Sequence, residues 1–286
     1  GIGVPLALGL TGVLLLIFAW LGEVTLVHVA AFTLAISLLW DGIAMRQETR
    51  GATLRLMDSA GRTWASRDYA PIGAFAQEPD ESLPLALERL GLAIPAGTPP
   101  GSYALYLGIV RADALLPVQV DGIDEAQTLM KLGDVTVTLP DSPPSLTRLP
   151  MENRLARPET VAGLTILGAT FPVAPTLAGE SVDITLFVRA EEVIAEDRTL
   201  LVRLAGEHGG AESSGWQLPA YPTSQWSAGY GIALPATVAL PGSLATGDYA
   251  LTAQWRNSNG GALGEPIALG TVAVEQRMAS FTPNTP

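Results

Sequence analysis

VDITLFVRA, the stretch from Val182 to Ala190, alternates apolar and polar side chains along most of its length. Its apolar residues recur at every second position from Val182 to Val188, and polar residues such as Asp183 and Arg189 fall between them. Successive side chains of a β-strand point to opposite faces of the sheet, so the pattern predicts a strand with one buried face. Alternation of this kind is typical of antiparallel sheets that face a core on one side and water on the other.

Further strands are predicted on the C-terminal side of this one. They are TLLVRLAG (Thr199–Gly206), GDYALTAQW (Gly247–Trp255) and LGTVAVE (Leu269–Glu275). The chain has 30 glycines and 22 prolines, and Pro-Gly and Ala-Thr-Gly segments lie between the strands, where they supply turns. Short strands separated by turns, in a unit of about 100 residues, predict a sandwich of the immunoglobulin or fibronectin type.

The same layout occurs twice in the chain. Three blocks of the first half align in order with three blocks of the second half: Leu34–Asp58 with Val182–Gly206, Ile94–Leu105 with Leu240–Leu251, and Leu132–Val137 with Leu269–Val274. The first copy has the longer last connection. A duplication of this kind indicates two tandem structural units. The predicted fold is therefore mostly β, with two tandem sandwiches that follow an N-terminal hydrophobic segment.

Residues 1–22 contain no charged side chain. A bilayer core requires about 20 apolar residues in a helix, so this segment predicts a transmembrane helix with membrane lipid as its partner. A buried element and a cleaved signal peptide are the alternatives. A second uncharged run, Val24–Trp40, predicts either a strand of the first sandwich or a second membrane helix, and the repeat favours the strand. Because basic residues mark the cytoplasmic side and the first one is Arg46, we expect the sandwiches outside the cytoplasm.

These observations predict five segments along the chain. They are a transmembrane helix at 1–22, a first sandwich at 23–138, a proline-rich linker at 139–160, a second sandwich at 161–276 and a flexible tail at 277–286. The sequence begins with Gly1 rather than Met, so we expect either a processed chain or, as the favoured interpretation, a piece of a longer protein.

Composition excludes several classes of function. A net charge of −12 disfavours nucleic acid as a partner, because nucleic-acid binding normally needs a basic patch. The absence of cysteine excludes disulfides, thiolate catalysis and Cys-ligated metals. The two histidines, His28 and His208, fall in different copies and are expected to be a packed and a solvated side chain rather than metal ligands. No cofactor is predicted.

No group of residues predicts a catalytic site. Serines such as Ser59 and Ser213 lack a nucleophile motif, and the carboxylates Glu191–Glu192 and Glu196–Asp197 are expected to lie in solvated connections. DGIDE (Asp121–Glu125) is a weak candidate for a calcium loop, since it lacks the complete ligand pattern. We therefore predict no metal site and no catalytic residue.

Aromatic residues are the remaining candidates for a binding site. Trp216, Tyr221, Trp226 and Tyr230 lie within fifteen residues of the second copy. Exposed rings could stack on a glycan, whereas buried rings would fill the space between two sheets, which is the commoner role of large aromatics. Both interpretations stay open, and Trp64 and Tyr69 of the first copy are expected to have a packing role.

The second copy resembles a known type of domain. The resembling segments are LTILGATF (Leu164–Phe171), LAGESVDITLFVRA (Leu177–Ala190), PTSQW (Pro222–Trp226), LPGSLATGDYAL (Leu240–Leu251) and LGTVAV (Leu269–Val274). Together they resemble the sandwich domains at the C-terminal ends of some bacterial multi-pass glycosyltransferases of the dolichyl-phosphate-mannose mannosyltransferase-like kind. The resemblance implies a parent whose catalytic carboxylates lie in loops between early membrane helices, and none of those loops is in this sequence. The first copy lacks counterparts of AGES and PTSQW.

Two functions follow from these expectations. The first is a non-catalytic, extracytoplasmic accessory module of a membrane glycosyltransferase-like protein, which contacts glycan or the membrane domain of its parent. The alternative is a stand-alone, membrane-anchored adhesion or carbohydrate-binding protein. Catalysis within this chain is not expected, although the parent could be a glycosyltransferase.

Overall fold

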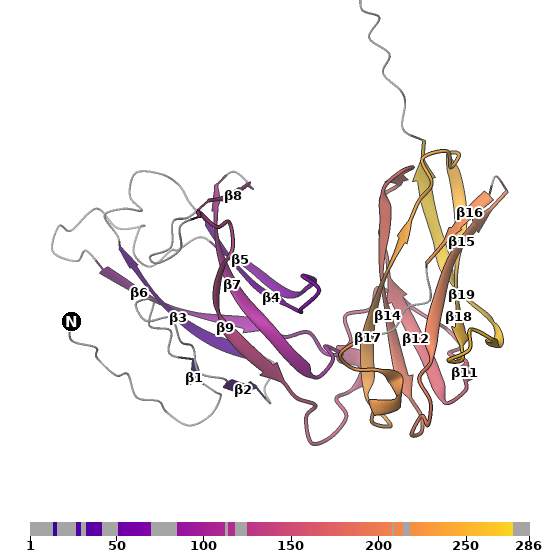
Figure 1. The fold of residues 1–286 in the computed structure, drawn as a ribbon, viewed down its shortest axis with the longest axis horizontal. Coiled ribbons are helices and arrows are strands. Elements are labelled where there is room, and N and C mark those ends of the chain that lie inside the picture. The colour runs from indigo at the N-terminus through magenta and orange to yellow at the C-terminus, as the bar shows by residue number, and fades with distance from the viewer. Residues whose placement is uncertain are drawn as a thin grey trace, which may run out of the picture. The chain divides into compact units, whose positions relative to one another are not determined.

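The computed structural model describes residues 14–15, 27–29, 33–41, 51–69, 85–111, 114–117, 125–207, 209–213 and 218–276. The chain divides into two compact units, Gly1–Ser142 and Pro143–Pro286, which we call the first and second sandwich. Both are built from β-strands (Figure 1), and the described residues include two short 3-10 turns but no α-helix. The prediction of a mostly β chain with two tandem sandwiches is confirmed.

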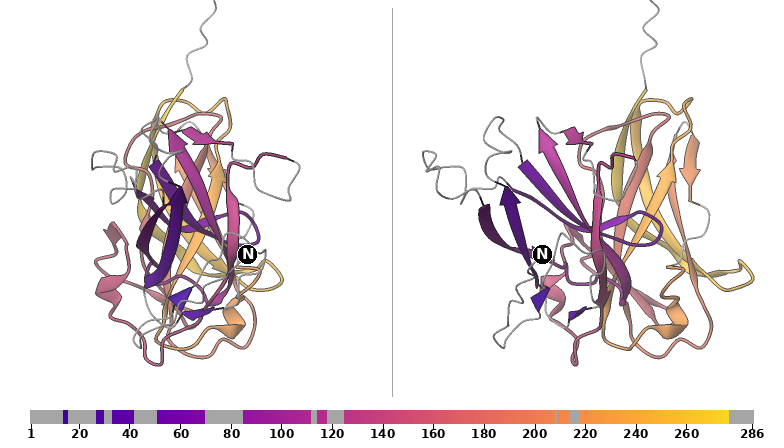
Figure 2. Two further views of the ribbon diagram at one scale, coloured as in Figure 1. Left: turned by 90° about the vertical axis from the view of Figure 1, so that its left-hand side faces the viewer. Right: turned by 60° about the vertical axis from the view of Figure 1, so that its left-hand side comes forward.

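The second sandwich consists of two sheets (Figures 1 and 2). One sheet contains, in spatial order, β10 (Asn153–Arg154), β12 (Leu164–Thr170), β14 (Ser181–Ala190) and β17 (Gly231–Ala239), with β11 (Thr160–Val161) paired to β12. The other contains β13 (Thr176–Leu177), β19 (Ala262–Glu275), β18 (Gly247–Arg256), β15 (Thr199–Gly206) and β16 (Gly209–Glu212). Two mainly antiparallel sheets in this order, each with short strands among its five, are the arrangement of an immunoglobulin-like sandwich.

The first sandwich has the corresponding strands. One sheet contains β1 (Leu14–Leu15), β3 (Thr33–Asp41) and β6 (Leu85–Ala93). The other contains β2 (Val27–Val29), β9 (Met130–Val137), β7 (Gly101–Arg111), β4 (Gly51–Met57) and β5 (Thr63–Tyr69), and β8 (Ala114–Leu116) pairs with β7.

The duplication extends to the pairing of individual residues. Leu56 pairs with Leu105 in the first sandwich, and the residues that align with them, Leu204 and Leu251, pair in the second. The short strands β2 and β13 both run parallel to the last strand of their sandwich. The longer last connection of the first copy contains β8, which has no counterpart in the second. The two copies therefore share strand order and register, and differ by a local insertion.

The N-terminal predictions are only partly covered by the structure. Within 1–22 the described residues are Leu14–Leu15, which form the short strand β1 and pair with β3 instead of lying in a helix. The rest of the predicted transmembrane helix lies outside the described residues. Among the described residues, no helix has the length and the hydropathy needed to cross a bilayer. In the second uncharged run, β2 and most of β3 bear out the strand interpretation for their residues. The predicted tail at 277–286 also lies outside the described range.

The predicted linker 139–160 does not act as a spacer along its whole length. The boundary between the units follows Ser142, and a 3-10 turn, η1 (Leu146–Arg148), begins soon after it. Leu149 is only 3% exposed, and β10 is already part of a sheet. The second sandwich therefore begins earlier than residue 161. We call residues 144–155 the strap.

Hydrogen bonds and close contacts hold the strap in place. One guanidinium nitrogen of Arg154, Nη2, lies 3.2, 3.4 and 3.3 Å from the carbonyl oxygens of Leu146, Thr147 and Leu149, and donates to them. A Cβ atom at Gly231 of β17 would lie 2.7 Å from Cδ1 of Leu149. A side chain at this position would therefore displace the Leu149 side chain of the strap.

The strap covers part of the outer face of the β12–β14–β17 sheet. Phe187 of β14 and Ala233 of β17 lie on the side opposite the core residues of their strands, yet Phe187 is only 2% exposed. A Cβ atom at Gly168 of β12 would approach the backbone of Asn153 to 2.3 Å. Part of this outer face, at Phe187 and Gly231, is therefore buried, whereas other residues of the same face, such as Asp183, are exposed, as is usual for the outer face of a sandwich.

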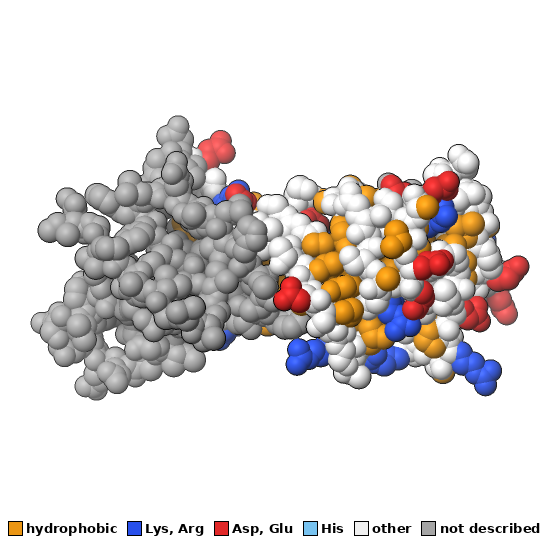
Figure 3. Space-filling view, turned by 90° about the horizontal axis from the view of Figure 1, so that it is seen from below, with side chains coloured by type: hydrophobic (Ala, Val, Ile, Leu, Met, Phe, Trp, Pro, Cys, Tyr) orange, Lys and Arg blue, Asp and Glu red, His pale blue; other side chains and the backbone are white. Residues whose placement is uncertain are grey.

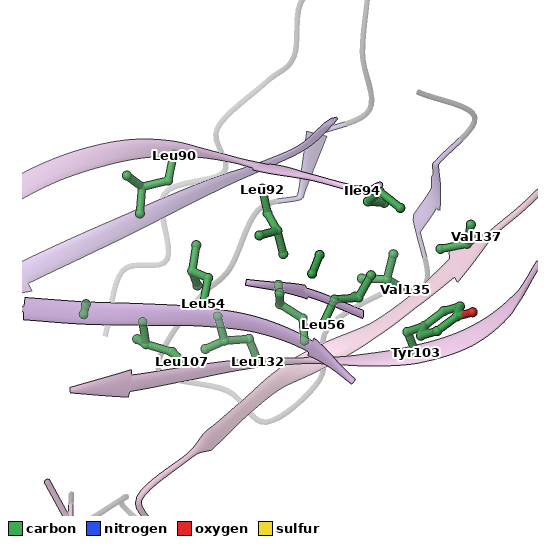
Figure 4. Close-up of a cluster of buried hydrophobic side chains, with 13 residues drawn as sticks. Leu54, Leu56, Leu90, Leu92, Ile94, Tyr103, Leu107, Leu132, Val135 and Val137 are labelled. Carbon is green, nitrogen blue, oxygen red and sulfur yellow. The ribbon is translucent and has the colours of Figure 1, made fainter. Parts of the chain in front are cut away.

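A tyrosine fixes the same corner in both copies. In the second sandwich the Tyr249 hydroxyl donates a 2.9 Å hydrogen bond to the carbonyl oxygen of Ala245, four residues earlier. In the first, Tyr103 donates a 2.7 Å bond to the carbonyl oxygen of Pro99. Figure 4 shows Tyr103 among buried side chains contributed by both sheets of the first sandwich. This arrangement is the tyrosine corner of immunoglobulin-like domains, and it explains the repeated Tyr-Ala-Leu block.

We expect Tyr249→Phe to lower the free energy of unfolding of the second sandwich by about 1–2 kcal/mol, because the Ala245 carbonyl loses its donor in a closed corner. Tyr103→Phe should act similarly on the first sandwich. Tyr106→Phe is the matched control on the strand of Tyr103, and its effect should be much smaller. Urea unfolding measures all three, and equal effects of the Tyr103 and Tyr106 variants would contradict the corner's role.

Leu149→Ala should destabilise the second sandwich by about 2–3 kcal/mol, since it removes buried methyl groups from the strap. Val173→Ala, at a side chain that is 87% exposed, is the control and should change stability by less than about 0.5 kcal/mol. Thermal or urea unfolding gives both values. If Leu149→Ala leaves the free energy of unfolding as little changed as Val173→Ala does, the strap acts only as a spacer.

Candidate functional site

Three connections meet at one end of the second sandwich, which we call the loop end. They are the β14–β15 connection (residues 191–198), the β16–β17 connection and the β18–β19 turn (residues 257–261). The backbone N–H of Arg198 donates a 2.7 Å hydrogen bond to Oγ1 of Thr223, and that of Ser224 donates a 3.0 Å bond to Oδ1 of Asp197. Because Arg256 pairs with Thr199, the third connection begins beside the first. In immunoglobulin-like domains such loop clusters commonly carry the binding function.

Three of the predicted aromatic residues, Tyr221, Trp226 and Tyr230, lie at this end, where Tyr221 and Trp226 pack against each other. Tyr221 is 7% exposed and Trp226 is 2% exposed, and their rings stack with centroids 6.3 Å apart and planes 21° apart. Nε1 of Trp226 donates a 3.0 Å hydrogen bond to the carbonyl oxygen of Tyr221. Burial raises the pKa of Tyr221, and hydrogen bonds with Ser227 oppose that shift. These two rings have the packing role that the sequence left open.

Tyr230 is half-buried in the same connection, and Trp216 lies outside the described residues. A sugar ring needs an accessible aromatic face for stacking, and Tyr221 and Trp226 present almost none in this structure. Contact between these four residues and a glycan stays a prediction.

The carboxylates predicted to be solvated have structural partners. Glu191 accepts from Nε of Arg189 at 2.9 Å and pairs with Nη2 of the same residue at 2.7 Å, and it also accepts from the Thr165 hydroxyl. Desolvation raises the pKa of Glu191, but the hydrogen bonds from Thr165 and Arg189 and the charge of Arg189 outweigh it and lower the pKa. Glu196 pairs with Arg198 at 3.1 Å. These groups support the fold of the connection.

Other sequence candidates also have structural roles or lie outside the described part of the chain. Oγ of Ser213 accepts a 3.0 Å hydrogen bond from the backbone N–H of Val202, and the pair is buried. Of DGIDE only Glu125 is described, and it is exposed. His28 falls in β2, and His208 is outside the described range. Among the described residues no group of three or more His, Cys, Asp or Glu side chains could hold a metal ion.

The aromatics of the first sandwich pack as expected. Trp64 lies edge-on to Tyr103, with ring centroids 6.1 Å apart, and its Nε1 donates a 2.9 Å hydrogen bond to Asp58. Tyr69 packs partly buried against the same apolar cluster. Both residues therefore belong to the core and its border.

Sequence reasoning missed a group of hydrogen-bond donors at the loop end. Nε of Arg198, Nε1 of Trp255 and Nε of Arg256 are all buried, and none has a hydrogen-bond partner among the described residues. The sequence could have indicated these donors by their positions along the strands. Arg198 directly precedes β15, and Trp255 and Arg256 end β18, where the two strands leave the core.

No family model and no curated protein matches this chain. The similarity to solved structures is distant, as three examples show. A DUF3823 family protein from Bacteroides ovatus ATCC 8483 is 10% identical, with 81% of this chain and 90% of that chain covered and a TM-score of 0.27. A protein from Corynebacterium diphtheriae described as membrane anchored is 10% identical, with 90% and 51% covered and a TM-score of 0.27. Red sea bream transglutaminase is 8% identical, with 94% and 32% covered and a TM-score of 0.23. Likeness at this level assigns no activity, ligand or partner to this chain.

The lowered pKa of Glu191 makes part of the stability pH-dependent. Its folded pKa lies below the ordinary value of 4.5, so the stabilisation is complete above that pH and is lost as the pH falls through the folded pKa. We expect Glu191→Gln to remove this component, which is less than about 1 kcal/mol because the pair is about one-third exposed.

Urea unfolding at pH 7 and below pH 4.5 measures this difference. Glu192→Gln, at the adjacent exposed position, is the control and should keep the wild-type pH dependence. The interpretation fails if Glu191→Gln and the wild type lose stability in parallel.

Proposed function

We propose that this chain is a non-catalytic accessory module that is attached to a membrane through residues 1–22 and held on the extracytoplasmic side. One observation carries the non-catalytic part. Three described side chains with catalytic potential serve the fold: Asp58 accepts from Trp64, Ser213 accepts from Val202 N–H, and Glu191 pairs with Arg189. A nucleophile or general acid needs a partner arranged for proton transfer, not a closed structural hydrogen bond.

The proposed parent is a glycosyltransferase-like membrane protein. The support is the resemblance of the second copy, whose segments correspond to strands and corners of the sandwich. LTILGATF contains β12, and LPGSLATGDYAL contains the tyrosine corner. Strand and corner residues such as these determine a fold and take no part in a reaction. They are therefore consistent with a module that positions or covers a catalytic region located elsewhere.

Membrane attachment is proposed from sequence, since residues 1–22 have no charged side chain and are long enough to span a bilayer. The sandwiches carry polar and charged side chains on their surface. On the face shown in Figure 3, acidic and basic side chains of the second sandwich are interspersed with apolar ones, as expected for a domain in water.

A stand-alone, membrane-anchored carbohydrate-binding protein is the second candidate. The observation that favours it is the loop end, where donors, carboxylates and a half-buried tyrosine lie on connections of an immunoglobulin-like sandwich. The reading frame upstream of Gly1 separates the two candidates. Several further hydrophobic segments with acidic loops would support the accessory module, and an immediate start codon would support the stand-alone protein.

Protease protection tests the side of the membrane. In sealed, right-side-out vesicles we expect trypsin to remove both sandwiches, and in inverted vesicles we expect them to be protected until detergent is added. A tag on either side of residues 1–22, followed by immunoblotting, identifies the fragment that remains. Protection in right-side-out vesicles would place the sandwiches in the cytoplasm and refute this proposal, and release from the membrane by high salt alone would refute the anchor.

A further inference from the structure

The turn between β18 and β19 presents an Asn-Gly pair to solvent. Residues 257–261 read Asn-Ser-Asn-Gly-Gly, and the last four are exposed. Two hydrogen bonds of 2.9 Å close the turn, one from the N–H of Asn257 to the carbonyl oxygen of Gly261 and one from the N–H of Gly260 to the carbonyl oxygen of Asn257. Gly260 has a φ of +79°, which glycine adopts without strain. Asn259 and Gly260 therefore form the tip of the hairpin.

The two asparagines of this turn have different surroundings. Oδ1 of Asn257 accepts hydrogen bonds from the backbone N–H of Asn259 at 3.1 Å and from that of Gly261 at 2.8 Å, so the Asn257 side chain is held against the turn. The side chain of Asn259 is exposed and makes no hydrogen bond to any described residue. It can therefore rotate among its staggered conformations, including those that bring its amide towards the backbone that follows.

The residue after an asparagine determines whether the side-chain amide reacts with the backbone. The backbone nitrogen of that residue attacks Cγ of the asparagine, ammonia leaves, and a succinimide ring closes. Water then opens the ring and leaves either aspartate or isoaspartate. A side chain on the following residue obstructs the attack, and Gly260 has none. A Cβ atom built at Gly260 would meet no atom within 4 Å, so the reacting bond lies in open space that water can reach.

We propose that Asn259 is a modification site, at which attack by the backbone nitrogen of Gly260 removes the side-chain amide. Water is the co-reactant and ammonia the leaving group, and no atom is oxidised or reduced. The product adds a negative charge to a chain whose net charge is −12. This inference goes beyond the proposed function and does not depend on it.

Asn257 is a positioning residue that slows the reaction. The attacking nitrogen of Gly260 donates to the Asn257 carbonyl, so this bond has to open before the attack. The Asn257 side chain holds the N–H groups on both sides of Gly260 and thereby keeps the turn closed. Opening is confined to an exposed tip, where local unfolding costs least, because strand pairing resumes at Arg256 and Ala262.

Peptide mapping by mass spectrometry tests the site. The full chain in detergent is incubated at mildly alkaline pH, which favours the deprotonated nitrogen, and is digested at intervals. We expect a progressive gain of about 1 Da that fragmentation locates at Asn259. Labelling by an isoaspartyl methyltransferase should detect the isoaspartate. Asn153, which precedes Arg154 in β10, and Asn257, which precedes Ser258, are internal controls and should keep their amides.

Two variants test the assigned roles. Asn257→Ala removes an acceptor of two N–H groups and should speed the change at Asn259 about fivefold. Asn259→Gln should abolish the mass gain at this position without altering urea unfolding, since the side chain is exposed.

Loss of the amide at Asn259 no faster than at Asn153 overturns the proposal, and so does a mass gain that persists in Asn259→Gln. An unchanged rate in Asn257→Ala refutes the protecting role of Asn257. The comparison of Asn259 with Asn153 uses the wild-type chain, so it decides the proposal even if Asn257→Ala does not fold.

Discussion

The hydrogen bond from a tyrosine hydroxyl to a carbonyl four residues earlier is the constraint around which both sandwiches are organised. Tyr103 and Tyr249 make it at the same corner, where the chain leaves one sheet and enters the other. The corner brings β7 and β18 into the centre of their sheets, and the residues that follow each tyrosine pair in the same register with β4 and β15. The shared register explains why sequence similarity survives in this block while it has faded elsewhere.

Alternating patterns made most of the fold predictable. The blocks aligned in the sequence contain β3, β4, β7 and β9 and their counterparts, because central strands need a buried side chain at every second position. The edge strands β6 and β17 were not found as a repeat. Each pairs on one side only, so its sequence is less constrained, and Pro235 in β17 is tolerated for that reason.

The strap and the donor group were not predictable from periodicity. Leu146, Leu149 and Met151 follow no strand period, and the prolines around them suggested a spacer. A signal was nevertheless present in VDITLFVRA, where Phe187 falls on the polar face, breaks the alternation and is buried in the structure. The donors of Arg198 and Trp255 come from residues far apart in sequence, and only the strand register brings them together. The aromatic cluster was found in sequence, but its packing was visible only in the structure.

The strap also determines how the second sandwich would respond to a mechanical load. The polypeptide enters this domain through η1 and the three carbonyls held by Arg154, before it reaches the long ladder between β14 and β17. Tension applied from the N-terminal side would therefore peel the strap contact by contact, whereas the ladder would have to break many hydrogen bonds together. The strap would lengthen first and the two-sheet core would stay folded, so this segment would serve as a short extensible tether between the N-terminal part of the chain and the second sandwich.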